Sequence, residues 1–320
     1  LARRRADARH RIAGPALADA RQARQLPLIR SDALTRFAFR GIPVRGAIVQ
    51  LGPTWKAVRT RNPDAASIQH VLGEACAAAA LMFSNIKLDG QISLQLQGSG
   101  PLRLLLAQCS SDGTLRAIAR PGEDANGEAM GFPELTRGAT LAITIERQSR
   151  GNQRYQGIVP LEGDSLGEAL EGYFEQSEQL PSRIWLMADG QAAAGLLLQR
   201  LPGELEDPDD WNRVTQLSET ITPGEMLALP ALDILHRLFH REPVEVFPQL
   251  DVRFSCPCSR DRVKDVLRSL GQAEIEAAAR ERGDVEVACE FCNEQYRFDA
   301  VDLGQIFSDF APDATPRTRQ

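Results

Sequence analysis

Alternating apolar and polar residues predict several strands in the first two thirds of the chain. In Gln91–Gln97, Ile92, Leu94 and Leu96 alternate with polar residues, as expected of a half-buried strand. The turn-forming residues Gly98–Pro101 end this strand. Similar patterns predict further strands at Leu102–Gln108, Leu115–Ala119, Thr140–Glu146, Tyr155–Val159, Arg183–Ala188 and Ala193–Leu201.

Two segments of the same region have a helical pattern instead. The alanine-rich segment Pro63–Phe83 predicts a long helix, and its wholly apolar run, Ala75–Phe83, is nine residues long. A membrane-spanning helix needs about 20 apolar residues, so we expect a buried core helix. A second helix is expected at Ser165–Gln176, because its apolar residues share one face. Strands outnumber helices without regular alternation, which predicts an α+β domain with a mainly antiparallel sheet over 32–202.

The composition changes after this domain. Residues 203–210 (GELEDPDD) contain five acidic side chains, which is typical of a solvated break. Helices as short as those that follow are marginally stable alone, so we expect 203–255 to be a weakly stable helical linker. The predicted helices are Trp211–Glu219, Pro223–Leu229 and Pro230–His240. The last of them contains an apolar stripe formed by Leu232, Leu235, Leu238 and Phe239.

Residues 256–320 have the pattern of a small separate module. Apolar residues at helical spacing predict a helix that Gly271 ends, and a second helix is expected at Ala273–Arg282. Val285 and Val287 then precede a Cys-x-x-Cys turn, and two aromatic residues follow it. This is the pattern of a zinc-ribbon hairpin. A module with so little apolar surface depends on a metal for its folding free energy.

Four cysteines in two close pairs carry the main chemical signal, C-x-C…C-x-x-C. Cys256, Cys258, Cys289 and Cys292 predict one tetrahedral Zn²⁺ per chain, with an iron–sulfur cluster as the alternative. A closed shell of four thiolates leaves no position for a substrate, so we expect no catalysis at the metal. Spacing alone favours a purely structural metal. The same thiolates are nevertheless open to oxidation, and metal loss would unfold the module.

The other cysteines and two histidines have simpler interpretations. Cys76 lies in the alanine-rich helix and Cys109 at the end of a strand, so we expect both to be buried, unreactive thiols. His236 and His240 have a spacing that can chelate metal. No further ligand pattern accompanies them, and we interpret them as part of a solvated helix face.

The net charge and the absence of several motifs disfavour some classes of partner and of protein. The chain has 37 Lys+Arg and 43 Asp+Glu, a formal net charge of −6, which disfavours nucleic acid or an anionic membrane as partner. Residues 1–31 are rich in arginine and are expected to be a disordered extension. The sequence lacks a secretory pattern, so paired cysteines indicate a reducing compartment and a cytoplasmic protein. It also lacks a phosphate loop, a nucleophile elbow and HExxH, so we expect no enzyme.

Several motifs resemble the thirty-three-kilodalton heat shock protein family, the redox-regulated holdase chaperones of bacteria. The metal segments Phe254–Arg260 and Cys289–Cys292 have the order and spacing of that family. The resemblance extends from about Phe37 to Phe310. In the first domain it rests on Leu88-Asp89-Gly90, Leu94–Gly98 with Gly100-Pro101, Tyr155-Gln156-Gly157, Leu161–Asp164 and Ser177–Arg183.

The resemblance implies a redox-controlled mechanism. In the reduced form four thiolates hold Zn²⁺ and the protein is inactive; oxidation forms the disulfides Cys256–Cys258 and Cys289–Cys292 and releases zinc. The module and linker then unfold, since the linker helices lose the module as a packing partner. The exposed surface binds unfolding client proteins without ATP, and the active form is a homodimer that passes clients to ATP-dependent chaperones. We expect client contact at Trp211, Leu232, Leu235, Leu238 and Phe239.

Two other classes of protein compete with this interpretation. A thiol-disulfide oxidoreductase would use Cys289–Cys292, but such motifs usually open a helix, and this one follows a Val-x-Val strand. A nucleic-acid-binding zinc ribbon would need a basic surface. Residues 256–320 instead have nine Lys+Arg and thirteen Asp+Glu, so a phosphate backbone would be repelled.

Overall fold

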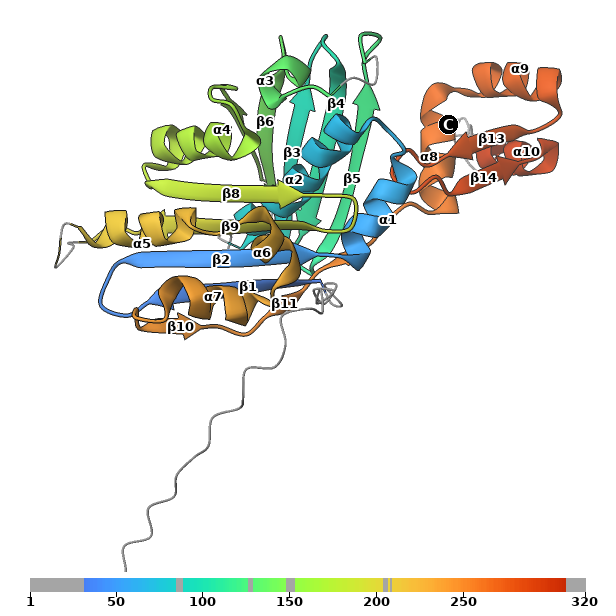
Figure 1. The fold of residues 1–320 in the computed structure, drawn as a ribbon. Coiled ribbons are helices and arrows are strands. Elements are labelled where there is room, and N and C mark those ends of the chain that lie inside the picture. The colour runs from blue at the N-terminus through green and yellow to red at the C-terminus, as the bar shows by residue number, and fades with distance from the viewer. Residues whose placement is uncertain are drawn as a thin grey trace, which may run out of the picture.

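The computed structural model describes residues 32–84, 89–125, 129–147, 153–203, 207 and 209–308. It has two mainly antiparallel sheets whose strands run in different directions, with a long helix between them (Figure 1). A small third unit at the C-terminal end is attached beside the second sheet. The predicted α+β class is confirmed. The expected extension at 1–31 lies outside the described residues.

The first sheet has the strand order β10-β1-β2-β9-β8, with β11 also pairing with β1. Four of its strands, β1, β2, β10 and β11, were not predicted. Nearly every residue of β2 is buried, so its sequence shows no alternation of apolar and polar positions. The strands are β1 (Ala33–Phe39), β2 (Val44–Leu51), β8 (Ser182–Ala188), β9 (Ala193–Arg200), β10 (Val244–Val246) and β11 (Leu250–Asp251).

The second sheet has the strand order β12-β5-β4-β3-β6-β7. Its pairs are antiparallel except for β12, which pairs with β5 in parallel. The predicted strands of this sheet are confirmed to within about two residues at their ends. They are β3 (Gly90–Gln97), β4 (Leu102–Ser110), β5 (Thr114–Pro121), β6 (Thr140–Arg147) and β7 (Arg154–Val159). The sixth strand, β12 (Arg253–Phe254), was not predicted.

Helix α2 (Ala66–Phe83) forms the centre of the core. Its small alanine side chains let it pack closely against β4 and β5 of one sheet and β8 and β9 of the other. Among the described residues it is the one helix long and apolar enough to cross a membrane, but 72% of it is buried inside the fold. The prediction of a buried core helix is confirmed. Helix α1 (Pro53–Arg61) precedes it, and α3 (Phe132–Leu135), α4 (Leu166–Tyr173) and the π-helix η1 (Phe174–Glu178) complete the domain.

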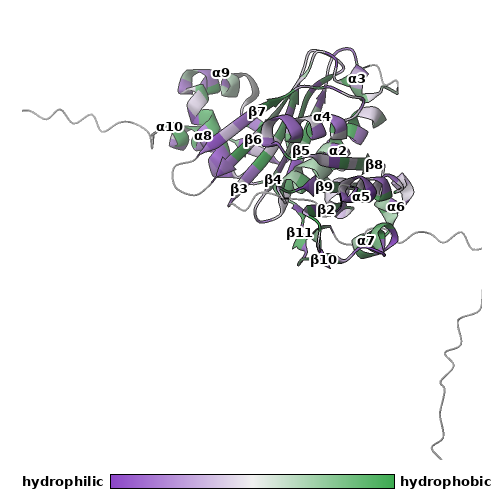
Figure 2. Cartoon of the chain, turned by 90° about the vertical axis from the view of Figure 1, so that its left-hand side faces the viewer, coloured by the Kyte–Doolittle hydropathy of each residue, from purple (hydrophilic) through white to green (hydrophobic). Residues whose placement is uncertain are grey.

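The three linker helices pack on the first sheet. They are α5 (Asp210–Glu219), α6 (Pro223–Ala228) and α7 (Ala231–Phe239), and their apolar residues join β1, β2 and β9 in one buried cluster. The expectation that the C-terminal module is their packing partner is therefore wrong. In both views the module lies on another side of the molecule from α7 (Figures 1 and 2).

The predicted stripe of α7 is only partly correct. Leu235, Leu238 and Phe239 are buried, and the ring of Phe239 lies 4.9 Å from that of Phe39. Leu232, in contrast, is 56% exposed, and Ile234 occupies the buried face in its place. The buried residues of α7 lie on the face that packs against β1 and β2, and this face differs slightly from the predicted stripe.

The linker reaches the module through short strands. Strands β10 and β11 pair with β1 of the first sheet, and β12 then pairs with β5 of the second. The amide of Ser255 donates to the carbonyl oxygen of Leu115 (3.1 Å), which extends this pairing to the residue before Cys256. The segment before the first cysteine pair is therefore fixed to both sheets.

The C-terminal module contains the predicted hairpin and two helices, together with a third helix that was not predicted. Gly271 and Gly283 end the two predicted helices with positive φ angles of 95° and 87°. The elements are α8 (Arg260–Leu270), α9 (Gln272–Arg282), β13 (Val285–Ala288), β14 (Gln295–Phe298) and α10 (Ala300–Ser308). The fully buried apolar residues of the module form one small cluster, made by Val263, Leu267, Ile275, Phe298, Leu303 and Ile306.

We predict that Phe239→Ala will loosen α7 from the first sheet. Phe239 is 2% exposed, and truncation of a buried aromatic ring costs about 3–5 kcal/mol. Hydrogen exchange of α7 peptides, followed by mass spectrometry, should become much faster. The matched control is Leu232→Ala on the exposed side of the same helix, for which we expect a change within about 0.5 kcal/mol. Equal exchange in both variants would show that α7 is not anchored by this contact.

Candidate metal centre

The four predicted cysteine ligands meet at one place. The sulfur atoms of Cys256, Cys258, Cys289 and Cys292 all lie within 4.8 Å of one another. Cys256 Sγ is 3.6 Å from Cys289 Sγ, and Cys258 Sγ is 3.3 Å from Cys292 Sγ. Among the described residues this is the one group of three or more candidate metal ligands that converges in this way. The sequence prediction of the ligand cluster agrees with this geometry.

Local backbone structure positions each pair. Cys256 and Cys258 lie between β12 and α8, and Ser259 caps α8 by accepting a hydrogen bond from the amide of Arg262 (3.3 Å). The second pair forms the turn between β13 and β14. There the amide of Cys289 donates to the Glu294 carbonyl (2.9 Å), and the turn includes Asn293 at φ 58°, a conformation that asparagine tolerates.

The donor set fits a thiophilic metal ion. In a tetrahedral site with Zn–S bonds of about 2.3 Å, neighbouring sulfurs lie about 3.8 Å apart. The separations of 3.6 Å (Cys256–Cys289) and 3.3 Å (Cys258–Cys292) are close to that value, and all six separations are within 4.8 Å. Four sulfur donors also match the ligand preference of zinc and of iron–sulfur clusters. The geometry therefore supports a four-thiolate metal site and does not by itself identify the metal.

The thiols differ in how readily they ionise. Burial opposes ionisation of Cys289, but hydrogen bonds from the amides of Cys292 and Phe291 outweigh it and lower its pKa to about 7. Burial and the neighbouring sulfurs raise the pKa of Cys292, and burial raises that of Cys256. Without a cation, the cluster thus holds one thiolate easily and resists a second. A bound metal ion would compensate this repulsion and allow all four to ionise.

Two side chains outside the cysteine pattern contact the sulfurs. The Tyr296 hydroxyl donates to Cys258 Sγ (3.2 Å), and Arg116 Nη1 lies 3.8 Å from Cys256 Sγ. In the sequence, Tyr296 is one of the two aromatic residues that predict the strand after the second cysteine pair, and no pattern indicated its contact with a sulfur or that of Arg116. Arg116 is 140 positions from Cys256, and an arginine in a strand carries no local signal of such a contact.

The remaining candidates are placed as expected. Cys76 and Cys109 are buried, and burial raises the pKa of both thiols, that of Cys109 to about 12. His236 and His240 are exposed on α7, with ring centroids 6.3 Å apart. Neither pair belongs to the metal-ligand group found among the described residues.

The residues expected to contact clients are mostly covered. Leu235, Leu238 and Phe239 are buried in the cluster between α7 and the first sheet, and Trp211 packs against it half-buried. Leu232 is the one member of the set that is exposed. In this state the set offers little apolar surface to another protein.

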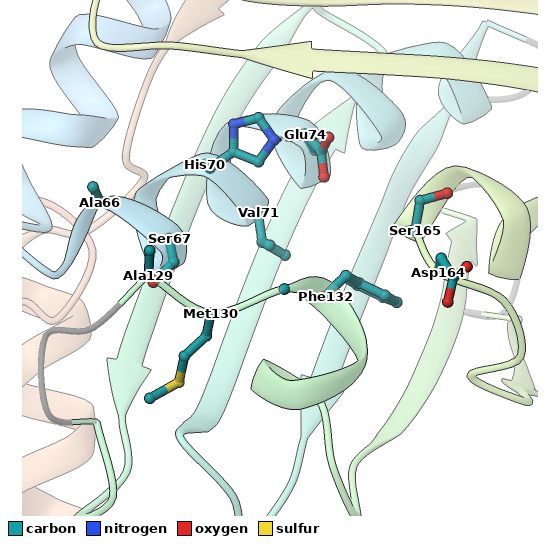
Figure 3. Close-up of a pocket in the computed structure, with 11 residues that line it drawn as sticks. Ala66, Ser67, His70, Val71, Glu74, Ala129, Met130, Phe132, Asp164 and Ser165 are labelled. Carbon is teal, nitrogen blue, oxygen red and sulfur yellow. Dashed lines mark ion pairs between the residues drawn. The ribbon is translucent and has the colours of Figure 1, made fainter.

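A hollow of about 580 Å³ lies elsewhere, between α2, α3 and the start of α4 (Figure 3). Its central polar pair is engaged within the fold: His70 Nδ1 lies 2.8 Å from the Ala188 carbonyl oxygen, and Nε2 lies 3.3 Å from Glu74. Ser165 accepts a hydrogen bond from the amide of Glu168 as the cap of α4. These side chains serve the fold, and the metal centre remains the stronger candidate site.

Comparisons with known proteins agree with this fold. A family model described as Hsp33 protein matches residues 32–299. A 33 kDa chaperonin from Chromobacterium violaceum is 45% identical over 276 residues, which cover 86% of this chain and 94% of that protein. A 33 kDa chaperonin from Ectopseudomonas mendocina is 44% identical over 295 residues, with 90% and 99% covered.

A solved structure shares the fold. The crystal structure of a 33 kDa chaperonin (heat shock protein 33 homolog) from Thermotoga maritima superposes with a TM-score of 0.74 at 23% sequence identity. The match covers 87% of this chain and 98% of that one. The family model and the similarity to curated relatives over nearly their whole length lead to one conclusion: this chain belongs to the Hsp33 family.

Proposed function

We propose that the protein is a redox-regulated chaperone that binds unfolding proteins without ATP and is inactive while its four thiolates hold Zn²⁺. Its membership of a family whose curated relatives are named chaperonins supports the general function. The observation that carries the redox part is the cluster of four cysteine sulfurs within 4.8 Å in a module with a very small core.

The proposed metal is one Zn²⁺ per chain, held by Cys256, Cys258, Cys289 and Cys292. Bound there, zinc supplies charge that keeps four thiolates together and free energy that folds the module. A four-cysteine shell leaves no open position for a substrate. This supports binding of client proteins without turnover, so we propose no enzymatic activity.

The proposed switch is the oxidation of the two cysteine pairs. Each disulfide forms when two thiolates lose two electrons to one peroxide, which takes up two protons and leaves as two waters. Pairing Cys256 with Cys258 and Cys289 with Cys292 leaves the two halves of the site unlinked. Disulfide sulfurs no longer bind zinc as thiolates do, so oxidation removes the free energy that folds the module.

The route from the module to the linker runs through backbone pairing. Unfolding of the cysteine segment would release Ser255 and β12 from β5. The neighbouring strands β11 and β10 would then pair with β1 without the support of β12. Strands this short are marginal without their neighbours. Undocking of the linker helices would expose their apolar face and the matching face of the first sheet.

The remaining parts of the proposal concern domains, partners and location. We propose a core domain over 32–202, a linker over 203–255 and a redox module over 256–320. Clients would contact the α5–α7 face, with a homodimer as the active form and later transfer to ATP-dependent chaperones. The location would be the cytoplasm, and nucleic acids and membranes are not proposed partners. Client contact involves Trp211, Leu232, Leu235, Leu238 and Phe239.

A specific feature weighs against the alternative of a thiol-disulfide oxidoreductase. The Cys289–Cys292 motif forms a hairpin turn between β13 and β14 and does not begin a helix, whose N-terminus would activate the attacking thiolate. A zinc ribbon with a purely structural metal is the other alternative, and the two tests that follow distinguish it.

The first test measures the chaperone activity directly. Light scattering of a thermally unfolding client should fall sharply with the peroxide-treated protein and remain high with the reduced, zinc-loaded protein. The reason is that only oxidation releases the apolar face of the linker. Cys109→Ala serves as a control for a cysteine outside the site. Equal protection by the reduced and oxidised forms, or none by either, would contradict the redox switch.

The second test identifies the disulfides. Trypsin cuts after Arg260, between the two cysteine pairs, so non-reducing peptide mapping separates the possible pairings. We expect each pair to appear in its own unlinked peptide after oxidation. Peptides joined through Cys256–Cys289 or Cys258–Cys292, whose sulfurs lie 3.6 Å and 3.3 Å apart in this structure, would mean that oxidation links the two halves of the module and would refute the proposed unfolding.

A further inference from the structure

Three arginines of the core domain contact the cysteine segments. Arg61 is the last residue of α1, and Arg116 and Arg120 lie on β5. They bring positive charge to the module from a different part of the chain, while the module itself has more acidic than basic residues. None of the three belongs to the ligand pattern.

Arg61 contacts both cysteine segments. Its Nε donates to the carbonyl oxygen of Cys292 (3.2 Å), and its guanidinium lies 4.6 Å from the ring centre of Phe254 in β12. Its own carbonyl accepts a hydrogen bond from the side chain of Asn293 (3.3 Å). A further hydrogen bond from Nη1 to the Ala57 carbonyl (2.8 Å) fixes the side chain against α1. Arg61 thus connects the turn to the strand that leads into the site.

Arg116 and Arg120 hold the other side of the turn. The guanidinium of Arg116 stacks 4.1 Å from the ring centre of Phe291 and places Nη1 3.8 Å from Cys256 Sγ. Gln108 accepts a hydrogen bond from Arg116 Nε (2.7 Å) and so orients it. Arg120 Nη2 lies 3.4 Å from the carbonyl oxygen of Glu290.

A buried asparagine keeps the arginines in register. Asn62 follows Arg61, and its side-chain oxygen accepts a hydrogen bond from the amide of Ala119 on β5 (3.0 Å). Its amide nitrogen donates to the Val58 carbonyl (2.8 Å) and lies 3.4 Å from that of Ala117. The end of α1 is thereby fixed to β5, so the backbone of Arg61 is held next to the strand that carries Arg116 and Arg120.

We propose that Arg61, Arg116 and Arg120 form a cationic dock that binds the folded, metal-loaded Cys289–Asn293 turn. Four thiolates around a divalent cation have a net charge of −2, which nearby guanidinium groups stabilise. The contacts to the carbonyls of Cys292 and Glu290 also require the turn to be folded. The dock therefore acts as an outer part of the metal site, and these core residues set how firmly the module keeps its metal.

This inference rests on the metal part of the proposed function and is independent of client binding. Its test uses the reduced full-length protein loaded with Zn²⁺, with transfer of the metal to a coloured chelator as the readout. We expect Arg116→Gln to lose zinc about tenfold faster, equivalent to about 1.4 kcal/mol. Arg116→Lys keeps the charge but not the flat stacking surface, so its rate of zinc loss should lie between those of the wild-type protein and Arg116→Gln. The matched control is Arg103→Gln, an exposed arginine on the adjacent strand β4.

A second readout separates a contact at the metal site from a general loss of stability. In the Co²⁺-loaded protein, Arg116→Gln should shift the sulfur-to-cobalt charge-transfer band, because the guanidinium next to Cys256 Sγ is removed. Arg103→Gln should leave the band unchanged. Phe291→Ala removes the same stack from the module side. Its effect on zinc loss should be less than additive with that of Arg116→Gln.

The outcomes distinguish the two proposals. Zinc loss at the wild-type rate and an unchanged cobalt band in both Arg116→Gln and Arg61→Gln would overturn the dock. If those variants do not fold, additive effects of Arg116→Lys and Phe291→Ala would overturn it instead. Failure of the wild-type protein to bind zinc would refute the metal assignment itself.

Discussion

The close approach of four cysteine sulfurs is the main physical constraint in the C-terminal part of the structure. The chain brings Cys256, Cys258, Cys289 and Cys292 within 4.8 Å, although a second thiolate beside the first is unfavourable. Amides of the turn stabilise one thiolate, at Cys289, and burial keeps protons on Cys256 and Cys292. A bound cation would offset the repulsion between thiolates at such a site. Oxidation of the sulfurs would remove the groups that bind the cation.

The core domain, the linker and the C-terminal module differ in how much apolar surface they bury. The two sheets and α2 share an extensive apolar core, whereas the described part of the module has one small cluster. The linker helices pack on the first sheet, and short strands connect them to the cysteine segments. The buried apolar cluster is therefore largest in the core domain and smallest beside the four cysteines.

Sequence patterns worked best where an element has one buried face. Strand β3 and helix α4 were predicted because their apolar residues alternate or recur with the right period. Strand β2 was missed because it is buried on both faces, and the short strands β10 to β12 exist only through pairing with other strands. The predicted apolar stripe of α7 was wrong at Leu232, which is exposed. Packing of α7 on the first sheet decides which of its residues are buried.

The four candidate ligands could be found from the sequence alone, because the C-x-C and C-x-x-C pairs are local and their spacing reflects the short reach of a cysteine side chain. The helices α2 and α4–α9 and the strands β3–β7 could also be predicted, because the spacing of their apolar residues is a local pattern. The neighbours of these elements, in contrast, follow from long-range packing. It placed α5–α7 on the first sheet, far from the module, and it brought Arg61, Arg116 and Arg120 to the metal turn. The arginine contacts join residues more than a hundred positions apart, and no local pattern encodes them.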